Sequence, residues 1–118
     1  MLKTFRDMEV WKKAHELSLE VFEVTKDLPR SEDYALTSQI RKSSNSASAN
    51  IAEGFGRRTK KDKRFFYTIS RGSALETQSH LLYGNSVKYF TDEITKYLLD
   101  EYDDLIYQLN KIMKSLGG

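Results

Sequence analysis

Apolar side chains recur at alternating steps of three and four residues along four segments of the chain. Breakers and capping residues bound these segments at about residues 7–28, 31–55, 60–88 and 92–115. This spacing places the apolar side chains on one face of an α-helix. No segment shows the sustained alternation of apolar and polar residues that is typical of a half-buried strand. The pattern therefore predicts an all-α protein with four amphipathic helices.

The last of the four segments has the clearest repeat. Its apolar or small positions follow one another as Thr95, Leu98, Tyr102, Leu105, Leu109, Ile112 and Leu116. Helices of similar length that are joined by short connections pack as an antiparallel bundle. We therefore expect an up-down-up-down four-helix bundle, and the 118 residues fit one domain that spans 1–118.

Local signals set the predicted helix ends. Pro29 restricts the backbone of the residue before it, so the first helix is expected to stop at residue 28. Gly54 and Gly56 permit the left-handed conformation that ends many helices, so the second helix is expected to stop near residue 55. Three residues have side chains that are preferred at helix N-caps and stand directly before a helical pattern: Ser31, Thr59 and Thr91.

Small polar residues are concentrated in the second helix, over residues 43–50. They form either a helix face that packs tightly against a neighbour or a polar surface that is offered to a ligand or a subunit. Gly72 in the third helix predicts a close approach of another helix, because glycine in mid-helix is otherwise unfavourable. Glu76 shares that side, and we expect donors from the second helix to bind it, namely Asn50, Ser43 or Ser44. We therefore predict structural roles within the bundle for three polar residues: Asn50, Glu53 and Glu76.

The net charge of +2 hides an uneven distribution. Residues 41–71 carry nine bases against two acids, a net charge of +7, whereas residues 1–40 and 72–118 have net charges of −2 and −3. A local excess of this size concerns binding partners rather than the fold. The predicted nucleic-acid-binding residues are the nine bases: Arg41, Lys42, Arg57, Arg58, Lys60, Lys61, Lys63, Arg64 and Arg71.

The core of this basic set lies at a loop and a helix N-terminus, where backbone N–H groups add to the attraction for phosphate. No base-reading motif accompanies it, so we expect recognition of the RNA or DNA backbone. Two alternatives remain open at this point. The block is a solvated loop without a partner, or it pairs with the acidic residues of a protein partner in a structural or adaptor role.

Composition argues against several other classes of function. The chain has no cysteine, which excludes disulfides, thiolate metal sites and cysteine nucleophiles. His15 and His80 lie on different predicted helices and belong to no metal-binding motif. We therefore expect no catalysis, no metal, no cofactor and no small-molecule substrate. No apolar run approaches the ~18 residues of a membrane span, so a cytoplasmic location without membrane contact is expected.

Several motifs give the chain a resemblance to a known family. They are FRDMEVWKKA at 5–14, LP at 28–29 with Glu32 and YAL at 34–36, QIRKS at 39–43, NIAEG at 50–54 and GSALE at 72–76. The sequence resembles the bacterial four-helix-bundle proteins encoded in intervening sequences of large-subunit (23S) ribosomal RNA genes. It is more distantly similar to the accessory protein of diversity-generating retroelements.

The resemblance implies a homopentamer with a central channel and binding of RNA or DNA through basic surface. Subunit contacts need apolar side chains that the bundle itself does not bury. The candidates from the sequence are Leu2, Phe5, Tyr89, Phe90, Tyr97 and Tyr107.

Overall fold

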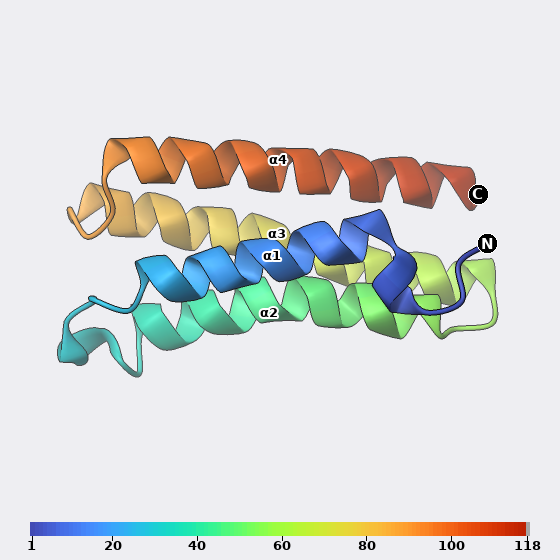
Figure 1. Ribbon diagram of the computed structural model, residues 1–118, viewed down its shortest axis with the longest axis horizontal. Coiled ribbons are helices and arrows are strands. Elements are labelled where there is room, and N and C mark those ends of the chain that lie inside the picture. Colours follow the sequence, from blue (N-terminus) through green and yellow to red (C-terminus); the bar gives the residue numbers. More distant parts are fainter. Residues whose placement is uncertain (118) are drawn as a thin grey trace.

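Four antiparallel helices form the protein in the computed structural model, which describes residues 1–117 (Figure 1). The helices are α1 (Glu9–Val24), α2 (Leu36–Phe55), α3 (Lys60–Ser86) and α4 (Asp92–Ser115). Two short 3-10 helices, η1 (Phe5–Asp7) and η2 (Arg30–Glu32), precede α1 and α2. Residues 1–117 contain no strand. The predicted all-α four-helix bundle is confirmed.

The helices stand at the corners of a bundle 43 Å long and 23 by 22 Å across. Each helix packs on the next in the sequence, and α1 also touches α4. In Figure 1, α1 lies in front and α3 behind, with α4 above and α2 below. The outer sides of α1 and α3 therefore face in different directions.

The apolar repeat of α4 lies along the bundle axis as the periodicity predicts. Thr95, Leu98, Tyr102, Leu105 and Leu109 of α4 are all buried. α1 and α2 also bury apolar positions, which are Val10, Ala14, Leu17, Val21, Ile40, Ala47 and Ile51. α3 differs from the expected pattern, because it buries Tyr67, Ala74 and Leu81 and leaves most of its large apolar side chains exposed. None of the helices in the described part of the chain combines the length and apolarity needed to cross a membrane.

The small residues of α2 pack against α3, in the most extensive contact of the bundle. The hydroxyls of Ser43 and Thr77 are 2.7 Å apart, and Ser70 Oγ donates to the carbonyl oxygen of Ala47 at 2.7 Å. Both hydrogen bonds are buried. Small side chains allow the two backbones to approach, and their hydroxyls find partners across the seam. The run of small residues is thus a packing face.

Two predicted helix ends are wrong. α1 stops at Val24 rather than residue 28, because Thr25 turns the chain and its Oγ1 donates to the carbonyl oxygen of Val21 at 2.8 Å. Ser31 is not an N-cap. It lies within η2, and α2 begins five residues later, where Glu32 Oε1 accepts from the Leu36 amide at 3.2 Å. The Glu32 carboxylate, one turn before Leu36, therefore binds the first amide of α2, which is the role predicted for the Ser31 hydroxyl.

The other two caps are confirmed. Thr59 Oγ1 accepts from the Asp62 amide at 3.0 Å, and Thr91 Oγ1 accepts from the Ile94 amide at 3.1 Å. α3 and α4 begin directly after these residues, as expected.

The roles predicted for the glycines need correction. Gly54 lies inside α2, and Gly56 ends the helix with φ −79°, so neither adopts the left-handed conformation. Nothing lies within 4 Å of the place that a Cβ at Gly72 would occupy, so no helix approaches there. The close approaches occur instead at Gly54, against Tyr67, and at Gly84, where a Cβ would overlap the ring of Phe90.

Candidate nucleic-acid interface

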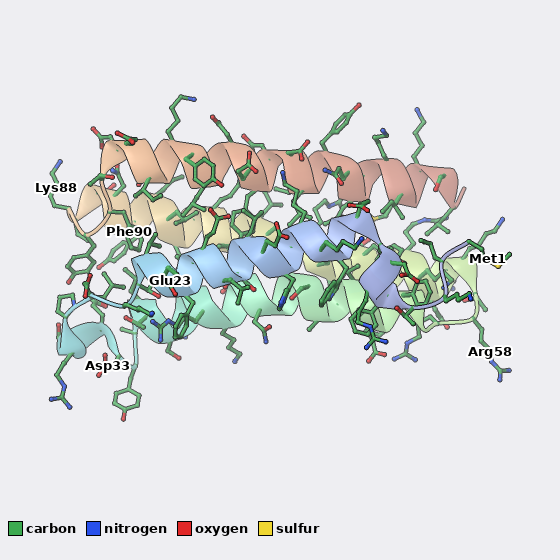
Figure 2. All side chains as sticks on the ribbon, viewed as in Figure 1. Met1, Glu23, Asp33, Arg58, Lys88 and Phe90 are labelled. Atoms are coloured by element: carbon green, nitrogen blue, oxygen red, sulfur yellow. The ribbon has the colours of Figure 1, made fainter. Side chains whose placement is uncertain are left out.

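The α2–α3 connection gathers six of the nine predicted bases at one end of the bundle. Arg57 and Arg58 lie in the connection, and Lys60, Lys61, Lys63 and Arg64 lie in the first two turns of α3. Figure 2 shows Arg58 at the same end of the molecule as Met1. The capped start of α3 at Thr59 determines which way these side chains leave the helix.

Two of the six bases are engaged within the protein. Lys63 Nζ donates to the carbonyl oxygens of Phe55, at 2.7 Å, and Gly54, at 3.4 Å. It thereby places a positive charge at the C-terminus of α2, where the helix dipole favours a cation. The guanidinium of Arg57 lies 4.4 Å from the centre of the Phe66 ring and 3.6 Å from Glu53.

The other four bases are the ones that remain available. Arg58, Lys60 and Lys61 are exposed, and Arg64 is half-buried. None of the ion pairs formed within residues 1–117 includes any of the four. We call them the end patch. The ring of Phe65, which is 60% exposed, lies beside it.

The three remaining predicted bases lie apart from the end patch. Arg41 is held at the α1–α2 seam: its Nε donates to Thr25 Oγ1 at 2.8 Å, and its guanidinium lies 4.2 Å from the Phe22 ring centre. Arg71 donates to Asn110 Oδ1 at 2.7 Å. Lys42 is exposed, but about 20 Å of helix separates it from the end of α2. The nine bases therefore do not form one surface.

The three polar residues with predicted structural roles, Asn50, Glu53 and Glu76, mostly contact residues of their own helix. Asn50 Nδ2 donates to the carbonyl oxygen of Ser46 at 2.9 Å, and Glu53 is exposed beside Arg57. The expectation for Glu76 is wrong. Its carboxylate is 53% exposed and lies 3.3 Å from His80 Nε2, on the same helix. The rotation of α3 turns Ser73 and Thr77 toward α2 and leaves Glu76 outside.

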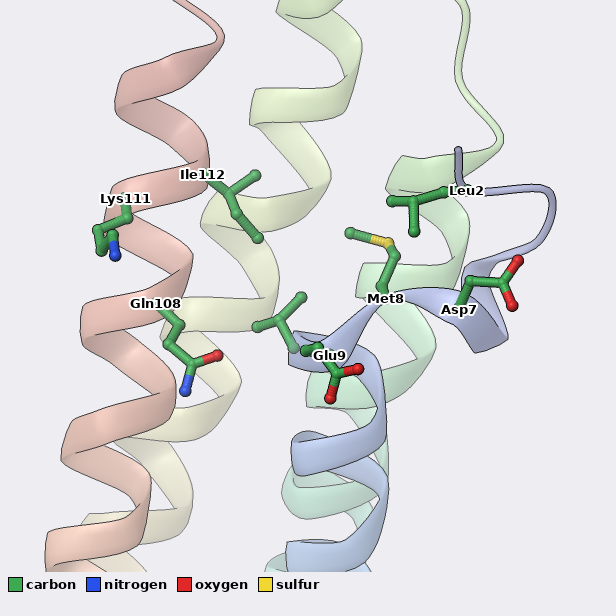
Figure 3. A pocket seen from close by; sticks show the side chains of 8 residues that line it. Leu2, Asp7, Met8, Glu9, Gln108, Lys111 and Ile112 are labelled. Atoms are coloured by element: carbon green, nitrogen blue, oxygen red, sulfur yellow. The ribbon is translucent and has the colours of Figure 1, made fainter.

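A groove that the sequence did not suggest lies between η1, the start of α1 and the last turns of α4 (Figure 3). Its volume is about 340 Å³, and its lining is mainly apolar, including Leu2, Met8, Val10 and Ile112. The carboxylate of Asp7 at its edge accepts from the backbone amides of Thr4 and Lys3, which lowers the pKa of Asp7. That carboxylate is thus a cap for η1. The groove contains no paired titratable groups of a catalytic kind.

Polar clusters elsewhere also have structural explanations. Lys13 Nζ lies 2.8 Å from Asp104 and 3.1 Å from Glu101, across the α1–α4 seam. Burial alone would lower the pKa of Lys13, but its hydrogen bonds to Asp104 and Glu101 outweigh this and raise that pKa. His15 stacks on Trp11 at 4.8 Å between ring centres. No group of three His, Cys, Asp or Glu in the described residues is arranged to hold a metal.

Most of the chain matches one known protein family. Residues 6–111 match the model of the 23S rRNA-intervening sequence protein family. The chain belongs to this family. None of the curated proteins compared with it is detectably similar.

A solved structure shares the fold of this 23S rRNA-intervening sequence protein. It is the crystal structure of a protein of unknown function from the S23 ribosomal protein family of Bacteroides thetaiotaomicron. The TM-score is 0.80 and the sequence identity 21%, and the match covers 89% of this chain and 98% of the other. Neither the family description nor this structure names an enzymatic activity.

Proposed function

We propose that this member of the 23S rRNA-intervening sequence protein family is a non-enzymatic oligomer that binds the backbone of RNA or DNA through the end patch. The observation that carries the proposal is the end patch itself. Its four bases lie together, and none takes part in the ion pairs of residues 1–117. Free Lys and Arg side chains bind phosphates by displacing condensed counterions.

The start of α3 adds to the attraction of the end patch for phosphate. The first turn of α3 offers backbone N–H groups, which strengthen binding of an anion at that helix end. No base-reading motif accompanies the end patch, so the proposed binding is not sequence-specific.

In an oligomer, a weak binding site is present once in every subunit. The family resemblance implies a homopentamer, and we propose that it acts in the cytosol; a ring repeats the end patch in every subunit. Several weak phosphate contacts on one nucleic acid then bind with avidity. The alternative is an adaptor ring that binds a protein and no nucleic acid, in which the end patch pairs with acidic residues of that protein.

A charge-matched pair of variants tests the proposal. The test variant replaces the end patch by glutamine at Arg58, Lys60, Lys61 and Arg64. The control replaces four exposed lysines away from that end of the bundle: Lys26, Lys42, Lys88 and Lys96. Both variants lose the same formal charge, so a general electrostatic effect changes both equally.

Binding of structured RNA and of duplex DNA is measured by fluorescence anisotropy from ~0.05 to ~0.3 M salt. We expect the test variant to bind at least ten-fold more weakly, with a salt slope lower by about three, and the control to stay within about three-fold of wild type. Equal binding by both variants would refute the end patch as the site. A wild type that binds neither nucleic acid at micromolar concentration would favour the adaptor alternative.

A further inference from the structure

The outer side of α3 carries a continuous apolar surface that the bundle leaves uncovered. Its large side chains are Phe65, Ile69, Leu75, Leu82 and Tyr83, which are 60, 37, 50, 51 and 54% exposed. Gly72 and Ser79 lie exposed between them, and the space beside Gly72 is open. We call this surface the α3 ridge. Its one carboxylate, Glu76, is 53% exposed and lies 3.3 Å from His80 Nε2.

A second uncovered surface lies where α1 and α2 run side by side. α1 contributes Trp11 and His15, both half-buried, and Leu19 and Phe22, which are 53 and 45% exposed. On α2, the small residue Asn45 lines a cavity with Leu19 and Phe22, and Ala49 lies exposed one turn further along the helix. We call this surface the α1–α2 channel.

The channel is hollow and nearly neutral. A cavity of about 260 Å³ opens between Leu19 and Phe22 of α1 and Ser44 and Asn45 of α2. Two cations lie against Phe22 at its end, Arg41 and Lys26. The guanidinium of Arg41 is already bound to Thr25, and Lys26 is paired with Glu23. The channel therefore suits an apolar partner better than a charged one.

The ridge and the channel cannot meet within one molecule. α1 and α3 occupy opposite corners of the bundle, with α1 in front and α3 behind in Figure 1. Both surfaces run along the bundle axis, over about 27 Å of helix for the ridge and about 16 Å for the channel. A ridge on one molecule can therefore lie lengthwise in the channel of another.

We infer that the α3 ridge of one copy packs into the α1–α2 channel of the next copy. This head-to-tail contact rests on the proposed assembly and names its surfaces. A ridge-to-ridge contact would leave every channel open, whereas one head-to-tail contact per subunit covers both surfaces. Contacts of this kind close into rings when the rotation between subunits permits.

The large side chains of the ridge supply more than half of the area of a stable contact. A half-exposed large side chain offers on the order of 100 Å². The five large side chains thus offer roughly 500 Å², before the small residues between them are counted, against about 800 Å² per partner in a typical stable complex. Because both surfaces are mainly apolar, assembly should depend less on salt than binding at the end patch does.

Two complementary variants test the contact. The ridge variant carries Leu75→Glu and Leu82→Glu, and the channel variant carries Leu19→Glu and Ala49→Glu. The control carries Tyr34→Glu and Tyr107→Glu, at side chains that are 97 and 62% exposed and lie outside both surfaces. All six positions are exposed, so the bundle should fold in each variant, which helicity and thermal unfolding check.

Sedimentation at ~50 μM separates the outcomes. We expect the wild type and the control to assemble and each interface variant to be monomeric. An equimolar mixture of the two interface variants should form a dimer and nothing larger. The ridge variant retains an intact channel and the channel variant an intact ridge, so the mixture can make one good contact and then stops.

Each contrary outcome has a distinct meaning. A monomeric wild type overturns the proposed assembly and this inference together. With an assembled wild type, an interface variant that still assembles overturns the surface it was designed to block. Two monomeric variants whose mixture stays monomeric overturn the head-to-tail pairing and leave the proposed assembly standing.

Discussion

Gly54 of α2 packs directly against the ring of Tyr67 of α3. A Cβ at position 54 would lie 2.7 Å from Tyr67 Cε1 and 3.2 Å from Phe66 Cβ. Only a hydrogen at this position lets the last turn of α2 lie so close to α3. The same turn ends at Phe55, whose carbonyl oxygen binds Lys63. The Gly54–Tyr67 contact therefore helps to position the helix ends that carry the end patch.

Replacing Gly54 by alanine should destabilise the bundle. The added methyl group overlaps an aromatic ring in a packed core, which typically costs about 1–3 kcal/mol. The better helix propensity of alanine returns at most about 1 kcal/mol. We expect a net loss of up to about 2 kcal/mol in the free energy of unfolding, measured by urea denaturation.

Gly72→Ala is the matched control for that substitution. Both residues lie inside helices, but the space beside Gly72 is open. Alanine there should raise the free energy of unfolding by about 0.5–1 kcal/mol. Since Gly72 lies on the α3 ridge, the assembly state is recorded at the same protein concentration. Stabilisation by both substitutions would contradict the close contact at Gly54.

The buried pair of Ser43 and Thr77 should show energetic coupling. Their hydroxyls form a hydrogen bond of 2.7 Å between α2 and α3. Removing one partner costs this hydrogen bond, about 0.5–1.5 kcal/mol, because the remaining hydroxyl keeps a backbone acceptor. That acceptor is the carbonyl oxygen of Ile40 for Ser43, at 3.2 Å, or of Ser73 for Thr77, at 2.9 Å. In a double-mutant cycle of Ser43→Ala and Thr77→Val, we expect the double variant to lose at least 0.5 kcal/mol less than the sum of the two singles. Additive losses would mean that the two hydroxyls do not depend on each other.

Arg41 should matter for stability and not for nucleic-acid binding. Its guanidinium bonds to Thr25 and stacks on Phe22 across the α1–α2 seam. Loss of these contacts in Arg41→Gln should lower the free energy of unfolding by roughly 1 kcal/mol. The affinity of the Arg41→Gln variant for RNA should remain within about two-fold of wild type. A ten-fold weaker affinity with unchanged stability would instead assign Arg41 to the nucleic-acid site.

The ion pair of Lys13 and Asp104 predicts a small dependence of stability on pH. Hydrogen bonds from Lys13 and then Gln108 lower the pKa of Asp104 below its ordinary value of 3.8. The native state thus binds this proton less readily than the unfolded state. Its contribution is present above pH 3.8 and is lost as the pH falls below that value.

The raised pKa of Lys13 works in the opposite direction. The contribution of Lys13 to stability is complete below pH 10.5 and is lost as the pH rises through the higher pKa of the folded state.

The contribution of Asp104 is the one tested at low pH. Because the Asp104 side chain is 47% exposed, we expect it to change the free energy of unfolding by less than about 1 kcal/mol. Urea unfolding of the wild type and Asp104→Asn at pH 3 and pH 6 measures it. The wild type should lose more stability than the variant between the two pH values.

Periodicity and caps were enough to predict the helices, because they depend on residues within a turn or two of each other. Thr59 and Thr91 cap the starts of α3 and α4 as expected, and α4 buries its predicted repeat from Thr95 to Leu109. The charge excess around the α2–α3 connection was equally visible, since neighbours in sequence at a helix start are also neighbours in space.

Only the tertiary structure decided how each helix is rotated about its axis and which side chains meet across the seams. That rotation puts Gly54, rather than Gly72, at the close contact and leaves Glu76 outside. It also gives Arg41 and Arg71 partners that lie 16 and 39 residues away in sequence. Such contacts result from packing all four helices at once, and no local pattern encodes them. The sequence by itself therefore determined four helices and a basic connection, and packing decided which bases remain free to bind.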